Sequence, residues 1–201
     1  MDEASTALMV ERVRGGDEQA FAELVRRHET TLLRYARGLL GRGGAFEDAV
    51  QDAFLKLARN PPRLAVEEPA NEHKLLGRWL LQVTRNHCMD WMRAERRRRR
   101  REGERALPDA AATASSGLDT LEAKDARAAV ESHLAALPET QREVLVLRLL
   151  GDKSYREIAA VTGKSIGTVG WLISRGLQRL ASELDPALDP QSSPALARRT
   201  S

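Results

Sequence analysis

Hydrophobic side chains recur along the first half of the chain at the three- and four-residue spacing of amphipathic helices. The first stripe ends before Gly41 and comprises Phe21, Leu24, Val25, His28, Leu32, Tyr35, Ala36 and Leu39. A second stripe is stopped by Pro61 and Pro62 and comprises Phe46, Ala49, Val50, Ala53, Phe54 and Leu57. A third runs from about Glu72 into a run of arginines, with Leu76, Trp79, Leu80, Val83 and Trp91 on its apolar side. This half is therefore predicted to form three packed helices.

The second half contains the pattern of a helix-turn-helix. A helix over 138–150 is expected to have proline in its first turn and to bury Val144, Leu145 and either Leu147 or Leu149. Ser154 and Glu157 form a capping box, and Gly163 supplies a left-handed turn. Ser165 then caps a second helix, whose apolar stripe is Ile166, Val169, Ile173, Gly176 and Leu180. Two helices joined by a glycine-containing turn are typical of DNA-binding modules.

Between and after these blocks the composition changes. Residues 102–120 are rich in alanine, serine, aspartate and glycine and poor in large apolar side chains, which predicts a flexible linker. Residues 185–201 contain three prolines and little to bury, which predicts a flexible tail. No alternating strand pattern is present. We therefore expect an all-α protein with two helical domains, 17–101 and 121–184, joined by the linker.

Charge is concentrated at one place. The 201 residues have a net charge of +3, but the segment from Arg93 to Arg105 holds eight arginines and three glutamates and is itself strongly positive. This local concentration of positive charge favours a polyanionic partner, although a basic helix end exposed to solvent would have the same composition.

Several classes of protein are disfavoured. One cysteine and four scattered histidines predict neither a disulfide framework nor a metal site, and we expect no cofactor. His87 and Cys88 are adjacent on a helix and diverge by about 100°, which suits no nucleophile and base. No apolar run is long enough to span a bilayer, and the first ten residues do not resemble a secretion signal, so a cytoplasmic non-enzyme is expected.

Three polar helix faces are candidate binding surfaces. On the last helix the outer face carries Gly167, Trp171, Ser174, Arg175 and Gln178, whose polar groups suit base edges and phosphates. The third helix has a polar stripe of Arg78, Gln82, Arg85, Arg93 and Arg96 between Trp79 and Trp91, which suits unstacked DNA. The second helix exposes Glu47, Asp48, Gln51, Asp52 and Leu55, an acidic patch that would repel phosphates and suits a basic protein partner. Each face is also compatible with ordinary solvated surface.

Long stretches of the chain resemble bacterial RNA polymerase sigma factors of the extracytoplasmic-function (ECF) type. The segments FAELVRRHETTLLRYARGLLG, FEDAVQDAFLKLAR and WLLQVTRNHCMDWMRAERRRR are similar to successive parts of sigma region 2. The segment LPETQREVLVLRLLGDKSYREIAAVTGKSIGTVGWLISRGLQRL is similar to sigma region 4. The resemblance implies a subunit that binds core RNA polymerase and directs it to promoters.

The resemblance also implies roles for individual residues. Asp48, Gln51, Asp52 and Leu55 would contact the coiled coil of the largest polymerase subunit, while region 4 would meet the polymerase flap. The −10 element would be bound by Arg78, Gln82, Arg85, Asn86 and Arg93. The −35 element would be bound by Ser165, Thr168, Gly170, Trp171, Ser174, Arg175 and Gln178. An anti-sigma factor is a further partner that the resemblance raises.

Departures from the family pattern and one alternative accompany this interpretation. Family members commonly have a basic residue and a serine where this chain has Gly170 and Trp171, and an alanine and an arginine where it has Gly176 and Leu177. Either Trp171 substitutes an apolar contact for charge, or this domain binds DNA weakly or serves a partner. The alternative to a sigma factor is a free-standing helix-turn-helix regulator, which would bind a specific duplex without polymerase.

Overall fold

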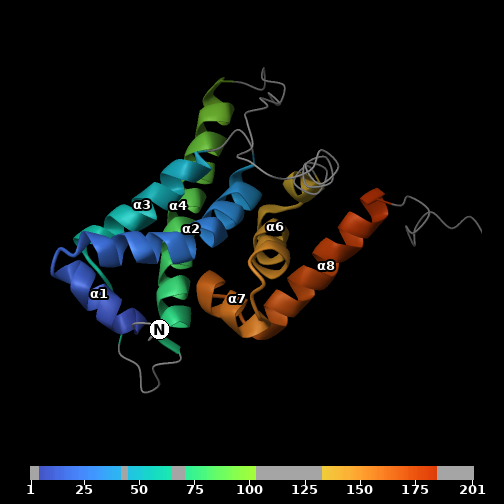
Figure 1. Ribbon diagram of the computed structural model, residues 1–201. Coiled ribbons are helices and arrows are strands. Elements are labelled where there is room, and N and C mark those ends of the chain that lie inside the picture. The colour runs from blue at the N-terminus through green and yellow to red at the C-terminus, as the bar shows by residue number, and fades with distance from the viewer. Residues whose placement is uncertain (1–4, 42–44, 65–70, 103–132, 185–201) are drawn as a thin grey trace, which may run out of the picture.

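The computed structural model describes residues 5–41, 45–64, 71–102 and 133–184, all of whose regular elements are helical. The expected all-α class is confirmed. Most of the predicted linker and the whole predicted tail lie outside the described residues. The helices form two adjoining groups, α1 to α4 and α6 to α8 (Figure 1).

The first group contains one helix that the sequence patterns did not predict. Its members are α1 (Thr6–Arg14), α2 (Glu18–Leu40), α3 (Phe46–Arg59) and α4 (Glu72–Glu102). Helix α1 was missed because it is short, yet it buries Met9, Val10 and Val13 against the other three. Its first turn is held by Glu72 of α4, whose carboxylate accepts hydrogen bonds from the Ala7 amide at 2.8 Å and from the Ser5 hydroxyl. The group is therefore a four-helix unit.

The ends of α2 follow from local sequence. The Asp17 carboxylate accepts from the Gln19 and Ala20 amides, both at 3.0 Å, and caps α2. Gly41 ends the helix with a positive φ of 71°, a conformation that favours glycine.

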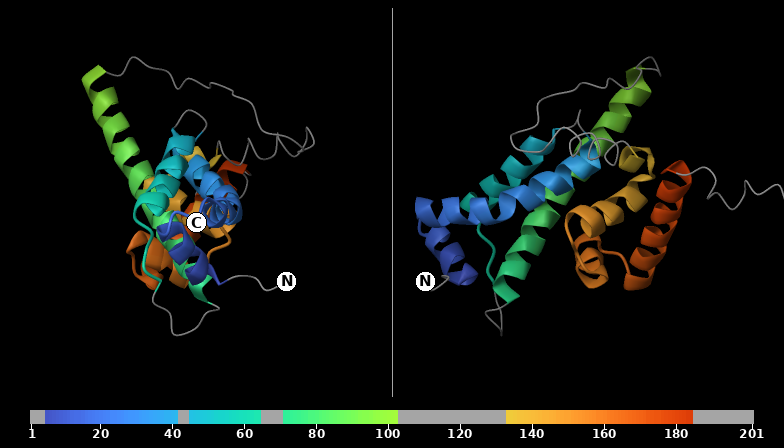
Figure 2. Two further views of the ribbon diagram at one scale, coloured as in Figure 1. Left: turned by 60° about the vertical axis from the view of Figure 1, so that its left-hand side comes forward. Right: turned by 45° about the vertical axis from the view of Figure 1, so that its right-hand side comes forward.

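Helix α4 is long, and its arginine-rich end projects beyond the other helices (Figures 1 and 2).

The second group comprises α6 (Glu139–Leu145), the π-helical turn η2 (Val146–Leu150), α7 (Tyr155–Thr162) and α8 (Ile166–Leu184). The expected capping box is present: the Ser154 hydroxyl accepts from the Glu157 amide, and Glu157 accepts from the Ser154 amide at 2.9 Å. Gly163 is left-handed with φ 71°. Helices α7 and α8 therefore form the predicted helix-turn-helix.

Three details of this group differ from expectation. Pro138 is the N-cap of α6 rather than a residue of its first turn. The predicted single helix over 138–150 changes to π-helical geometry at Val146. Ile166, placed on the apolar stripe of α8 by its spacing, is the first residue of the helix and is 48% exposed, while Leu172 is buried instead.

The two groups pack directly on each other. Val146 of η2 faces Gly38 of α2, where an added Cβ would lie 2.8 Å from the nearest valine methyl. The Arg142 guanidinium donates to the Leu39 carbonyl at 3.0 Å. Helix α7 lies beside the first half of α4, as two views agree (Figures 1 and 2). One continuous core thus runs through both predicted domains.

Candidate polymerase and nucleic-acid interfaces

Helix α3 presents the expected acidic face. Asp48 and Gln51 are exposed, and Leu55 is 43% exposed despite its apolar side chain. On the opposite side of the helix, Ala53 and Leu57 are fully buried, and this fixes the orientation of α3. The amphipathic pattern therefore leaves a carboxylate, an amide and an apolar side chain on one accessible surface.

Asp52 belongs to this face but is already engaged. Its carboxylate forms an ion pair with Lys56 at 2.9 Å and lies 3.4 Å from His87 Nδ1 on α4. Hydrogen bonding to Lys56, assisted by His87, holds the pKa of Asp52 below its ordinary value. The ionised carboxylate of Asp52 is therefore already paired with Lys56, whereas the carboxylate of Asp48 is exposed to a partner.

A groove runs beside this face between α2 and α3. Its volume is about 480 Å³. Apolar lining comes from residues such as Phe21, Val25 and Phe54, and the carboxylates of Glu29 on α2 and Glu47 on α3 also line the groove. An apolar groove with an acidic rim can accept side chains from a helix whose exposed charges are basic.

Helix α4 carries the stripe expected to bind the −10 element. Arg78, Gln82 and Asn86 are exposed. Arg93 is also exposed and forms an ion pair with Asp90 at 3.1 Å, a contact between two solvated side chains that competes little with a ligand. Four of the five candidates are therefore accessible along one helix.

Arg85, the fifth candidate, is turned toward the second group of helices. Its guanidinium donates to the carboxylate of Glu143 on α6, and the Glu143 side chain is only 1% exposed. Burial opposes the charge of Arg85, but the hydrogen bonds to Glu143 raise its pKa above the ordinary value. The hydroxyl of the buried Tyr35 has no hydrogen-bond partner among the described residues, and burial with the nearby Glu143 raises its pKa. In this arrangement Arg85 joins the two groups rather than facing solvent.

Helix α8 presents the surface expected to bind the −35 element. Six of the seven candidates are exposed, namely Ser165, Thr168, Trp171, Ser174, Arg175 and Gln178. Trp171 is 59% exposed, so the core of the helix-turn-helix does not cover it. Ser165 acts as the expected cap, its hydroxyl accepting from the Thr168 amide at 3.1 Å.

Gly170 is the exception on α8 because it packs inward. A Cβ at this position would lie 3.6 Å from the Tyr155 ring of α7. Gly170 is half-buried beside α7, and a Cβ there would make only ordinary van der Waals contact with the ring. Sequence spacing did not indicate this contact, because it depends on how α7 crosses α8.

His28 is buried as its place on the core stripe predicts, but it is not fully hydrogen-bonded. Its ring stacks on His73 of α4 with centroids 4.6 Å apart, and Nε2 has no hydrogen-bond partner in the described structure. Gly77 of α4 lies over the same ring, where a Cβ would lie 3.6 Å from His28 Cε1. Burial, with positive charge nearby, lowers the His28 pKa to about 4.

The described residues outside these surfaces offer few reactive or metal-binding groups. Burial raises the pKa of the Cys88 thiol to about 12, which leaves it unreactive. Within the described ranges no group of three or more histidine, cysteine, aspartate or glutamate side chains is arranged to hold a metal ion. No helix among the residues described is both long and apolar enough to cross a membrane.

These surfaces define a class of protein. The chain is all-helical, with a basic, polar stripe on one long helix and a separate helix-turn-helix of the kind that is typical of DNA-binding proteins. The acidic face of α3 is a third exposed surface.

Comparison with known families identifies the chain more closely. Residues 24–98 match the sigma-70 region 2 family, and residues 127–180 match the sigma-70 region 4 family. The chain is 32% identical over 170 residues to the RNA polymerase sigma-E factor of Streptomyces avermitilis, covering 85% of this chain and 88% of the relative. The protein belongs to the sigma-70 family of RNA polymerase sigma factors, in the ECF group, as its sequence resemblance predicted.

Other relatives are longer. A probable sigma factor, RfaY, of Xanthomonas campestris is 30% identical over 172 residues, covering 84% of this chain. The chain spans 41% of the length of that relative and 66% of the ECF sigma factor BldN of Streptomyces coelicolor.

Two solved structures share the fold. CnrH in complex with the cytosolic domain of CnrY is matched with a TM-score of 0.64 and 25% identity, covering 91% of this chain and 99% of CnrH. The sigma factor RpoE of Bartonella quintana, solved in complex with the anti-sigma factor NepR, is matched with a TM-score of 0.64 and 26% identity. That match covers 82% of this chain and 95% of the other.

Proposed function

We propose that this sigma factor docks on core RNA polymerase through the acidic face of α3 and contacts promoter DNA through α4 and α8. The observation that carries the proposal is the exposed set of Asp48, Gln51 and Leu55 beside the apolar groove between α2 and α3. Such a face is unsuited to phosphates and suited to a basic coiled coil with apolar side chains at its seam. The protein then acts in the cytoplasm as an initiation factor rather than an enzyme.

The DNA contacts divide between two helices. Arg78, Gln82, Asn86 and Arg93 on α4 would bind the −10 element, with Arg85 joining them once its ion pair with Glu143 opens. Trp171, Ser174, Arg175 and Gln178 on α8 would bind the −35 element, with Ser165 and Thr168 at the start of the helix and Gly170 supporting the module. Because the solved relatives were captured with CnrY and NepR, an anti-sigma factor is proposed as a further partner.

Binding to core polymerase tests the proposal. Asp48→Lys should weaken binding by about tenfold or more, because it places a cation opposite a basic partner. Glu11→Lys is a matched control, since it reverses an exposed acidic charge on α1 rather than on the face of α3. A fluorescence titration with purified core enzyme measures both.

Two outcomes would contradict the proposal. Equal affinities for wild type and Asp48→Lys, with folding intact by circular dichroism, would remove α3 as the docking face. Tight, specific binding to a promoter duplex in the absence of polymerase would favour the free-standing regulator instead.

A further inference from the structure

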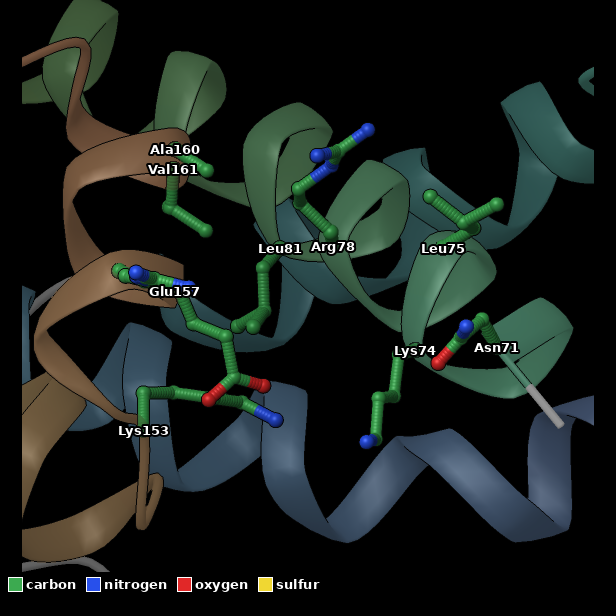
Figure 3. A pocket seen from close by; sticks show the side chains of 10 residues that line it. Asn71, Lys74, Leu75, Arg78, Leu81, Lys153, Glu157, Ala160 and Val161 are labelled. Carbon is green, nitrogen blue, oxygen red and sulfur yellow. The ribbon is translucent and has the colours of Figure 1, made fainter. Parts of the chain in front are cut away.

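A cavity of about 430 Å³ lies between α4 and α7, at the junction of the two groups of helices (Figure 3). Its walls are formed by side chains from α4 and the preceding Asn71, and by side chains from α7 together with Lys153, two residues before that helix. Small-molecule sites fall in the range of about 300–1,000 Å³ and favour junctions between domains. The cavity shares Arg78 with the stripe of α4 proposed to bind the −10 element, and it shares no residue with the polymerase or −35 surfaces described above.

Positive charge predominates in the cavity. Lys74 and Arg78 line it from α4, and Lys153 and Arg156 line it from the other side. None of the four forms a salt bridge with a carboxylate among the residues that the structure describes. They therefore offer cationic groups that no protein anion in the described ranges neutralises by direct contact.

One carboxylate, that of Glu157, also lines the cavity, and it is already hydrogen-bonded within the protein. Glu157 Oε2 accepts from the Ser154 amide at 2.9 Å and from the Ser154 hydroxyl at 2.6 Å. The hydrogen bonds from Ser154 lower its pKa, with Lys153 and Lys74 contributing. Figure 3 shows Lys74, Lys153 and Glu157 directed toward the same space between the helices. One carboxylate facing four cations leaves the cavity with an excess of positive charge.

Apart from Asn71, the rest of the lining is apolar. Leu75 and Leu81 contribute from α4, and Ala160 and Val161 contribute from α7. This combination suits a ligand that carries several negative charges on one part and a flat, weakly polar group on another. We propose that the cavity binds a small phosphate-bearing anion, of the nucleoside polyphosphate or inorganic polyphosphate class.

Ligand binding here has a structural consequence. Lys74 and Arg78 belong to the first group of helices, and Lys153 and Arg156 belong to the second. An anion held by both pairs binds only when α4 and α7 lie together, so it stabilises the packed arrangement of the two groups. The ligand would thereby keep Arg85 in its contact with Glu143.

Titration calorimetry on the full chain, without polymerase, tests the site with two probes, GTP and inorganic tripolyphosphate. At least one probe should bind and raise the unfolding temperature in a concentration-dependent way. Lys74→Glu combined with Lys153→Glu should weaken that binding by about tenfold or more. Arg97→Glu is the matched control, because it reverses an exposed charge of α4 in the arginine run, outside the cavity.

The outcomes separate the sources of the ligand and the competing explanations. Tighter binding of GTP than of tripolyphosphate would support a nucleoside polyphosphate, and equal binding would support recognition of the phosphates alone. No binding of either probe, or an equal loss with Arg97→Glu, would overturn the proposal. If the double variant lost binding to duplex DNA but kept binding to GTP, the cations would belong to the nucleic-acid surface instead. The polymerase titration with Asp48→Lys is independent of each result.

Discussion

Arg85 of α4 and Glu143 of α6 form an ion pair across 58 residues of sequence, with the glutamate side chain almost wholly buried. The arginine lies on the stripe proposed to bind the −10 element, and the glutamate lies in the region 4 block. The charge that would attract DNA is therefore satisfied internally while the two blocks are packed together. The guanidinium has to leave Glu143 before it can reach a phosphate.

The first prediction concerns the stability of this pair. Glu143→Gln should lower the free energy of unfolding by about 2 kcal/mol, because a partly buried guanidinium loses its counter-charge. Glu139→Gln is the matched control: Glu139 pairs with Arg96 at 2.8 Å, but that arginine is 59% exposed, so its loss should cost less than about 1 kcal/mol. Urea unfolding of the full chain measures both, and equal costs would show that the buried pair contributes no more than a surface pair.

A second prediction concerns the close approach of α2 and η2. Gly38→Ala should destabilise the protein by about 1–2 kcal/mol, because the new methyl group would lie 2.8–2.9 Å from both Val146 methyls. In a Val146→Ala background the same change should cost much less, since the opposing methyls are gone. A double-mutant cycle by chemical denaturation measures this coupling, and strictly additive costs would contradict the contact.

The buried imidazole of His28 should make stability depend on pH. Its pKa is about 4 in the folded protein, against about 6.5 when exposed in the unfolded chain. Between these values the unfolded state binds the proton and the folded state does not, so stability should fall as pH is lowered from 6.5 toward 4, by up to about 3 kcal/mol. His28→Gln should flatten the unfolding free energy over this range. An unchanged pH slope in the variant would show that other groups cause the dependence.

Trp171 provides a test of DNA recognition. Because the ring is 59% exposed, Trp171→Ala should leave the unfolding temperature nearly unchanged. If the ring covers a thymine methyl in the major groove, promoter binding by the holoenzyme should weaken by about 1–3 kcal/mol. The loss should depend on the −35 sequence, which competition between promoter variants would reveal. A marked drop in unfolding temperature would assign the ring a structural role.

Much of the molecule could be predicted from the sequence alone because its signals are local. The cap at Asp17, the capping box of Ser154 and Glu157, and the left-handed Gly163 each depend on residues within a few positions. Hydrophobic periodicity identified α2, α3, α4 and the helix-turn-helix, and with them the accessible sides of α3 and α8. Helix α1 was missed because nine residues give too few repeats for a pattern, although Ser5 caps it locally by accepting from the Leu8 amide.

Only the tertiary structure decided how the two blocks meet. Periodicity shows that a helix has a buried side but not which helix covers it. The sequence did not show that Gly38 lies against Val146, or that Glu143 pairs with Arg85, because the partners in each contact are far apart along the chain. The cations around the cavity come from two segments far apart in the chain and meet only when α4 and α7 pack. Sequence determined the helices, their caps and their faces, because these depend on near neighbours, whereas the contacts between faces depend on shape and charge complementarity that no local pattern encodes.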